Sequence, residues 1–170
     1  AKISIECQVP NTSKRIDFII TGQTDTHQDC AVIVELKQWS EATATNLDGV
    51  VKTYVGGAVR EVSHPSYQAW SYAALLQGFN AAVEDQQIKL QACAFLHNCA
   101  DPSPLTSPFY AEYLQKAPLF AKSDVLRLSE FIKQHVKYGD ARNVMYQIEH
   151  GEIRPSKGLA DAIAKMIEGN

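Results

Sequence analysis

Residues 30–37 read CAVIVELK, a nearly continuous apolar run that closes on Glu35 and Lys37. Runs of this length and composition are typical of strands that are buried on both faces of a sheet. We therefore predict a central strand here. Because side chains two residues apart leave the same face of a strand, Glu35 and Lys37 are expected to point the same way.

Further strands are predicted on both sides of this run. Apolar and polar residues alternate in the two segments that precede it, as expected for strands with one buried face. Gly56-Gly57 separates two more strand-like segments and predicts a hairpin. The predicted strands are 3–9, 14–21, 30–36, 50–55, 58–62 and 90–96, with a turn at 10–13.

Helical patterns follow His64-Pro65, where the proline favours extended backbone in the residue before it. The predicted helices are 66–82, 108–115, 124–137 and 157–167. This order of elements predicts an α/β or α+β fold, with a central mixed sheet flanked by helices. We expect residues 1–100 to form the core and residues 101–170 to form a helical extension that leads to a following domain.

Bulk properties narrow the function classes. A hydrophobic content of 45% and a charged content of 21% in 170 residues describe one soluble globular domain. The formal net charge of −3 gives no overall attraction for nucleic acid, so such binding needs a local basic patch. No apolar run is long enough to span a bilayer, so no membrane association is expected. The four cysteines form no CxxC pair, which favours free thiols in a reducing, cytoplasmic setting.

Two acidic residues interrupt or end apolar strands, and this is the pattern that points to chemistry. Asp17 lies within RIDFII (residues 15–20), and Glu35 ends the central run. Unpaired carboxylates in such positions cost free energy, which a divalent cation would offset. Mg²⁺ prefers hard oxygen ligands, so Asp17, Glu35 and the backbone carbonyl of Leu36 are the candidate metal ligands. Lys37 would lie beside the metal, where its ammonium group can orient water and stabilise charge on a phosphate.

Basic and aromatic residues near these motifs are candidates for contacting a substrate. Cations would contact phosphates, and an aromatic ring would stack on a base. The alternative is a solvated surface for the cations, a place in the core for the ring, and a structural hydrogen bond for the histidine. The candidate substrate-binding residues are Arg15, Lys14, Lys52, Arg60, Trp39 and His64.

The order Asp, then Glu-x-Lys, then Gln68-x-x-x-Tyr72 resembles the PD-(D/E)xK, restriction-endonuclease-like nuclease superfamily, including the QxxxY motif of its recombination-nuclease branch. Gln68 and Tyr72 are four apart and so share one helix face. Tyr72 as a core residue and Gln68 as a loop cap are the alternatives. Nearly the whole chain also resembles the N-terminal region of bacterial Schlafen-group helicase-like proteins. The segments that carry this likeness are VPNTSKRIDFIITG, VELKQWS, VGGAVREVSHPSYQAWSYAALL and GEIRPSKGLADAI.

The resemblance implies a Mg²⁺- or Mn²⁺-dependent nuclease that acts on DNA or RNA, with Asp17, Glu35, Lys37, Gln68 and Tyr72 as its catalytic residues. It also implies that a P-loop ATPase or helicase-like domain follows, although no GxxxxGK[ST] motif occurs here. Many superfamily members carry a further acid on a helix before the first strand. We expect that helix to lie outside this chain, which begins without methionine in a strand pattern. The alternative is a nuclease-like module that binds nucleic acid with weak or no catalysis.

Overall fold

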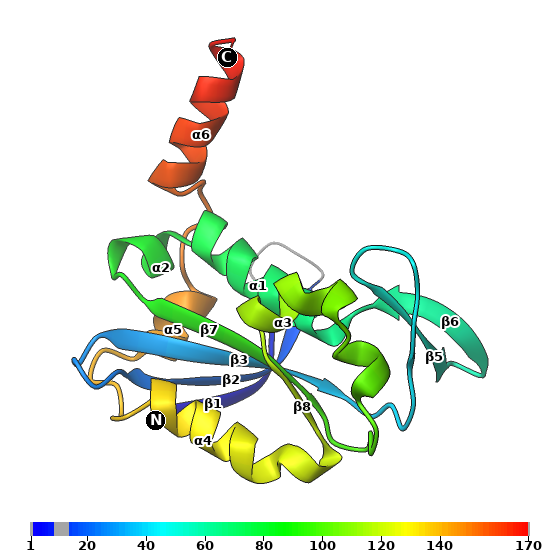
Figure 1. Cartoon of the computed structure of the whole chain (residues 1–170). Coiled ribbons are helices and arrows are strands. Elements are labelled where there is room, and N and C mark those ends of the chain that lie inside the picture. Colours follow the sequence, from blue (N-terminus) through cyan, green and yellow to red (C-terminus); the bar gives the residue numbers. More distant parts are fainter. Residues whose placement is uncertain (1, 9–13, 170) are drawn as a thin grey trace.

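The computed structural model describes the backbone of residues 2–8 and the whole of residues 14–169. The predicted turn at 10–13 lies outside these residues. A five-stranded mixed sheet runs through the centre in the order β1-β2-β3-β7-β8 (Figure 1). The first three strands are antiparallel neighbours, and β3, β7 and β8 run parallel. The strands are β1 (Lys2–Gln8), β2 (Arg15–Gln23), β3 (Asp29–Lys37), β7 (Lys89–Leu96) and β8 (Leu119–Ala121).

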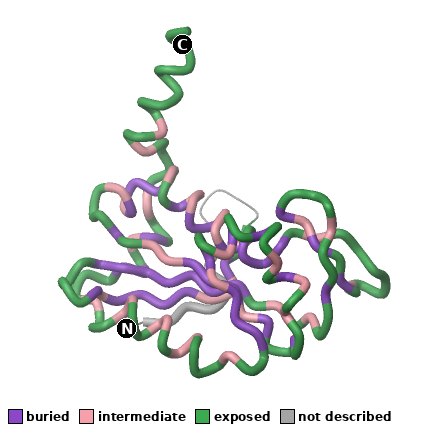
Figure 2. The backbone as a smooth tube through the Cα atoms, viewed as in Figure 1, coloured by how far each residue is buried: buried purple, intermediate pink, exposed green. Residues whose placement is uncertain are grey.

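The central run behaves as its sequence indicates. From Asp29 to Glu35 every residue of β3 is buried, because helices cover both faces of the sheet (Figure 2). Ala31 and Ile33 pack on one face with α1 and α5, and Val32 and Val34 pack on the other face with α4. The mixed α/β architecture with a helix-flanked mixed sheet is therefore confirmed.

The helices form the outer layers. The first covering layer contains α1 and α2, with α5 packed beside them in the same core cluster. The second layer is α4, whose Phe131 and Ile132 contact the face opposite α1. The helices are α1 (Pro65–Phe79), α2 (Ala81–Asp85), α3 (Ala111–Lys116), α4 (Val125–His135), α5 (Val144–Glu149) and α6 (Lys157–Ile167), with short 3-10 turns η1 (Ser103–Leu105), η2 (Pro108–Tyr110) and η3 (Lys122–Asp124).

A second, three-stranded antiparallel sheet extends to one side of the main sheet (Figure 1). Its strands are β4 (Thr43–Ala44), β5 (Val50–Val55) and β6 (Ala58–Ser63). The predicted hairpin forms here, and Gly56 and Gly57 both have positive φ, which glycine adopts without strain. Of the three strands, β5 packs inward through Val51 and Thr53, while its other residues are partly or fully exposed.

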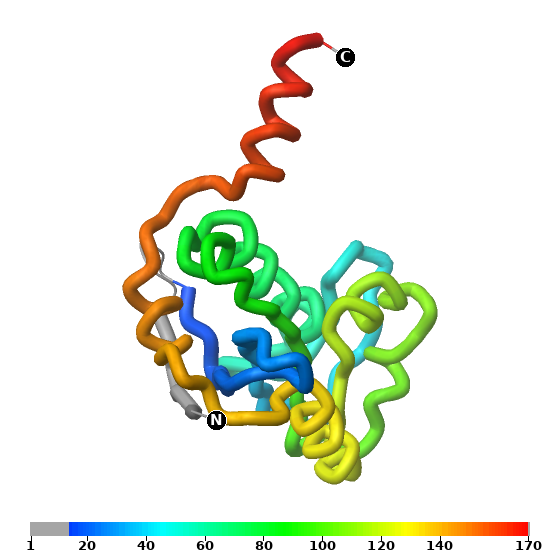
Figure 3. Tube along the Cα trace, turned by 90° about the vertical axis from the view of Figure 1, so that its left-hand side faces the viewer, coloured from blue at the N-terminus to red at the C-terminus, as the bar shows by residue number. Residues whose placement is uncertain are grey.

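The predicted division near residue 100 does not match the packing. Beyond residue 100, β8 pairs with β7 as an edge strand, and α4 and α5 cover the two faces of the main sheet. Of the helices in the described part of the chain, only α6 projects away from the body, as an arm (Figure 1, Figure 3). Residues 119–149 thus belong to the core. Among the described residues, no helix is long and apolar enough to cross a membrane.

Candidate active site

The two acidic residues of the predicted site lie side by side at one end of the main sheet. The ladder between β2 and β3 runs as far as the pair Phe18 and Val34, and Asp17 and Glu35 are the next residues along each strand. Asp17 reaches across to β3, where its Oδ2 accepts a hydrogen bond of 3.0 Å from the Leu36 backbone N–H. This contact holds the Asp17 carboxylate next to Glu35.

Glu35 is a buried carboxylate, with only 2% of its surface exposed. Burial raises the pKa of Glu35 to about 7 from an ordinary value of 4.5, because the charged form loses its hydration. Lys37 opposes this rise in pKa, and the negative charge of Asp17 adds to it. Glu35 therefore keeps a proton at mildly acidic pH in the metal-free protein.

Lys37 lies on the same face of β3 as Glu35, as the spacing predicts. Its Nζ is 3.0 Å from Glu35 Oε1, and the Lys37 side chain keeps 20% of its surface exposed. The other carboxylate oxygen of Glu35, Oε2, is buried and has no hydrogen-bond partner among the described residues. In the ionised form this oxygen is a buried acceptor without a donor, which carries the full free-energy cost of its lost hydration. In the protonated form Glu35 hydrogen-bonds to the Asp17 side chain, which adds to the rise in the pKa of Glu35.

The donors at this end of the sheet fit a hard divalent cation. Glu35 Oε2 is a candidate oxygen ligand that accepts no hydrogen bond from the described residues, and Asp17 supplies a second carboxylate beside it. The N–H of Leu36 faces β2, and in a strand the carbonyl of the same residue points to the same side, so it is a third candidate oxygen. No group of three or more His, Cys, Asp or Glu side chains suited to a metal occurs in the described part of the chain. Mg²⁺ commonly takes one or two carboxylates, with water and phosphate completing its shell, so two carboxylates are a sufficient set.

Helix α1 brings the predicted glutamine and tyrosine to the same place. Gln68 and Tyr72 lie one turn apart, and Gln68 Nε2 donates a hydrogen bond of 2.9 Å to Tyr72 Oη. Burial raises the pKa of Tyr72, Gln68 opposes the rise, and the negative charges of Glu35 and Asp17 add to it. The charges act on Tyr72 because α1 packs directly over this face of the sheet.

An open cavity of about 440 Å³ lies against this cluster. Lys37, Gln68 and Tyr72 line it. Lys14 and Trp39 line the same cavity, which therefore receives residues from β3, from α1 and from the segment before β2. Ser71 was not among the predicted site residues, yet it also lines the cavity, and its hydroxyl donates to the Gln68 carbonyl at 2.7 Å. Its position three residues after Gln68, on the same helix face, was the available signal.

The structure assigns His64 to the scaffold instead of the substrate surface. His64 is completely buried at the start of α1, where its Nδ1 accepts a hydrogen bond of 3.0 Å from the Ser66 N–H. With Nδ1 as an acceptor, Nε2 carries the hydrogen and donates to the Leu105 carbonyl at 2.9 Å. Burial lowers the pKa of His64. Both ring nitrogens are thus engaged within the protein, and the predicted substrate contact at His64 is replaced by a helix-capping role.

The other predicted contacts divide between the cavity and the neighbouring hairpin. Trp39 is half-buried, and the Lys37 Nζ lies 5.5 Å from its ring centroid. Lys52 and Arg60 are exposed on β5 and β6, where Lys52 pairs with Glu61 at 3.7 Å and Arg60 donates to the Val55 carbonyl. Lys52 lines a second cavity of about 470 Å³ that Trp39 also lines, whereas Arg60 lines neither cavity. Arg15 is exposed at the first position of β2.

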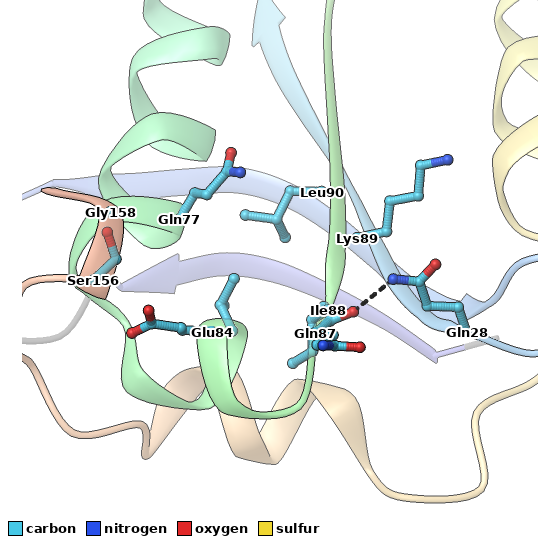
Figure 4. A pocket seen from close by; sticks show the side chains of 10 residues that line it. Gln28, Gln77, Glu84, Gln87, Ile88, Lys89, Leu90, Ser156 and Gly158 are labelled. Atoms are coloured by element: carbon cyan, nitrogen blue, oxygen red, sulfur yellow. Dashed lines mark hydrogen bonds between the residues drawn. The ribbon is translucent and has the colours of Figure 1, made fainter. Parts of the chain in front are cut away.

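A further cavity of about 440 Å³ lies at the opposite end of the parallel strands, near the first residues of β7 (Figure 4). Three glutamine side chains line it with Glu84 and Lys89, and the Gln28 amide donates to the Gln87 carbonyl at 2.8 Å. Glu84 Oε1 accepts from the Lys157 N–H at 2.7 Å, so this carboxylate caps the start of α6. Glu84, which lines this cavity, therefore helps to anchor the α6 arm.

Comparison of the chain with protein-family models, with curated proteins and with solved structures finds no match. The residues themselves are thus the basis for assigning a function. Asp17 and Glu35 are adjacent carboxylates, and Glu35 Oε2 accepts no hydrogen bond from the described residues. The Lys37 Nζ lies 3.0 Å from Glu35 Oε1, and an open cavity adjoins the cluster.

Proposed function

We propose that this domain is a metal-dependent nuclease of the PD-(D/E)xK type that hydrolyses phosphodiester bonds of DNA or RNA. The observation that carries the proposal is Glu35, a carboxylate 2% exposed with an unpartnered Oε2 beside Asp17. Buried ionisable groups with strongly shifted pKa values are concentrated at functional sites, so the position of Glu35 favours a catalytic or ligand-binding role. The adjoining lysine and open cavity favour a phosphate-containing substrate.

Three oxygen donors would hold Mg²⁺ or Mn²⁺: the carboxylates of Asp17 and Glu35, and the Leu36 carbonyl. A bound divalent ion supplies activation of water and neutralisation of the charge that develops on the phosphate. Asp17 has its orientation fixed by the Leu36 N–H, so ordering it for binding costs little further entropy. Glu35 has to release its proton to act as a ligand, which its pKa of about 7 makes easy at neutral pH and above.

Lys37 contacts Glu35 and also lines the cavity, so its side chain would lie next to a phosphate bound there. Its ammonium group would orient the attacking water and stabilise negative charge on the phosphate oxygens. Tyr72 accepts its hydrogen bond from Gln68, which leaves the tyrosine hydroxyl hydrogen to donate toward a phosphate oxygen. Gln68 therefore positions Tyr72, and Tyr72 contacts the substrate.

A second candidate function is binding of nucleic acid without hydrolysis, within a protein that also carries a helicase-like ATPase. Two observations favour it. The net charge is −3, and no third acidic side chain joins Asp17 and Glu35 among the residues that the structure describes. Nucleases that use two metal ions need more ligands than this pair supplies.

Hydrolysis assays separate the two candidates. Labelled single- and double-stranded DNA and RNA are incubated with the wild type, with Glu35→Gln and with Glu130→Gln, a control at an exposed site on α4. The nuclease proposal predicts cleavage with Mg²⁺ or Mn²⁺ that stops with EDTA, falls about 100-fold or more in Glu35→Gln, and is kept in the control. No cleavage of any substrate, together with identical Mn²⁺ titrations of wild type and Glu35→Ala, would overturn the nuclease proposal and favour the binding-only function.

A further inference from the structure

We infer that the substrate is a single strand of nucleic acid, which lies in a groove that runs from the acidic pair past Trp39 to the β5–β6 hairpin. This inference rests on the proposed function and names its substrate class. The groove consists of the two adjoining cavities of about 440 and 470 Å³. Trp39 and Val55 line both of them, so the cavities meet at these two side chains.

Aromatic rings are spaced along this groove. Tyr67 and Tyr72 line the cavity beside the acidic pair, and Tyr54 lines the cavity on the hairpin side. Trp39 lies between them, and Tyr54 has 69% of its surface exposed although it is a large ring. Its cross-strand partner Val59 is 68% exposed and lines the same cavity, which makes an apolar shelf on the hairpin. Tyr54 and Tyr67 are exposed, Trp39 is half-buried and Tyr72 is buried. Accessible rings such as those of Tyr54 and Trp39 are the platforms on which the bases of a single strand stack.

The charges along the groove favour a single strand over a duplex. Three lysines line it: Lys14 and Lys37 on one side of Trp39 and Lys52 on the other. Lys37 is paired with Glu35, Lys52 is paired with Glu61, and the acidic residue Glu41 also lines the hairpin side. Duplex binding relies on many phosphate contacts, about six to ten in typical proteins. A groove with three cations in a chain of net charge −3 does not supply them, whereas stacking needs exposed base faces that a duplex conceals.

Trp39 is placed to connect base binding to the chemistry. The Lys37 Nζ lies 5.5 Å from its ring centroid and 3.0 Å from Glu35 Oε1. A base stacked on Trp39 would therefore bring its own phosphate to Lys37 and the acidic pair. The hairpin side would hold the neighbouring nucleotides through Tyr54 and Lys52.

Binding is measured in EDTA, so that no cleavage occurs. The chain has two tryptophans, so the Trp70→Phe variant leaves Trp39 as the only one and its fluorescence reports on the groove. Single-stranded oligonucleotides should quench this fluorescence and bind at least about ten times more tightly than the duplex of the same sequence. Trp39→Ala and Tyr54→Ala should each weaken single-strand binding about five- to 100-fold. The control is Tyr146→Ala, an exposed tyrosine on α5, and it should bind like the wild type.

Salt dependence provides a readout that a merely structural role would not change. With three lysines in the groove, the slope of log K against log salt should be about −2 for a single strand. Lys52→Ala should reduce this slope by about 0.7, and Trp39→Ala should leave it unchanged. Duplex binding as tight as single-strand binding, or wild-type affinity in both aromatic variants, would overturn the inference. Single-strand binding through Trp39 without any metal-dependent cleavage would instead support the groove and overturn only the nuclease proposal.

Discussion

Replacing Glu35 by glutamine should stabilise the metal-free protein at alkaline pH. Glutamine has nearly the same shape as the protonated acid, and its amide never ionises. Glu35 is 2% exposed, and its pKa is raised to about 7 in the folded protein from an ordinary value of 4.5. The folded state therefore retains a proton between these pH values that the unfolded chain releases. The stability that this proton confers is complete below pH 4.5 and is lost as the pH rises through 7.

The magnitude follows from the two pKa values. Each pKa unit corresponds to about 1.4 kcal/mol, so ionising Glu35 inside the folded protein costs about 3 kcal/mol above pH 7. The attraction of Lys37 is already part of this difference in pKa. Glu35→Gln should therefore unfold about 6 to 12 °C higher than the wild type at pH 8, and within a few degrees of it at pH 4.5.

Thermal denaturation followed by circular dichroism, in EDTA between pH 4.5 and 8.5, measures this difference. The control is Glu130→Gln, an exposed position on α4, whose pH profile should follow that of the wild type. A Glu35→Gln variant that is less stable than the wild type at pH 8 would refute the reasoning. In that case the ionised pair with Lys37 at 3.0 Å stabilises the fold, and Glu35 is a structural residue.

Three further predictions concern the same region. Asp17→Asn should keep the hydrogen bond from Leu36 through its amide oxygen, yet lose the rise in melting temperature that Mn²⁺ gives the wild type; an unchanged rise would remove Asp17 from the ligand set. Lys37→Ala should retain that metal-dependent rise and lose hydrolysis by about 100-fold or more, and equal losses of both would show that Lys37 only supports the metal site. Because burial lowers the pKa of His64, the stability from its neutral form should be present above pH 6.5 and lost as the pH falls below it. In a Glu35→Gln background, which removes the opposing titration, His64→Gln should abolish this acid-side loss in urea denaturation curves, and an unaltered curve would contradict the assignment.

The central part of the fold could be predicted because its signals are local. The apolar run of residues 30–37 identifies β3, and a two-residue period places Glu35 and Lys37 on one face. The short elements could not be predicted in this way. The strand β8 has three residues, too few to show a period, and it forms because β7 offers it a parallel edge. The helix predicted at 66–82 divides at Asn80, whose side chain accepts from the Val83 N–H and so begins α2.

In the candidate site, too, local sequence patterns predict some features, whereas features that depend on distant segments could not be predicted. Neighbouring strands with aligned ends were enough to predict that Asp17 and Glu35 lie together. The buried oxygen of Glu35 and its raised pKa depend on α1 covering this end of the sheet, which no spacing in the sequence reveals. His64 caps α1 through the nearby Ser66 N–H, but its second ring nitrogen donates to a partner 41 residues away, the Leu105 carbonyl. Residues whose roles depend on distant segments are those that a single sequence describes least well.

The hydrogen bond from the Leu36 N–H to Asp17 also affects which site residue is substituted first in homologues that have lost the activity. Asp17 satisfies a backbone group of the neighbouring strand, so an apolar replacement loses a structural bond as well as a ligand. Glu35 carries a buried charge whose removal stabilises the fold at neutral and alkaline pH. Neutral substitution should therefore replace Glu35 first and Asp17 last. An inactive homologue of this domain would then retain Asp17 and carry a different residue at position 35.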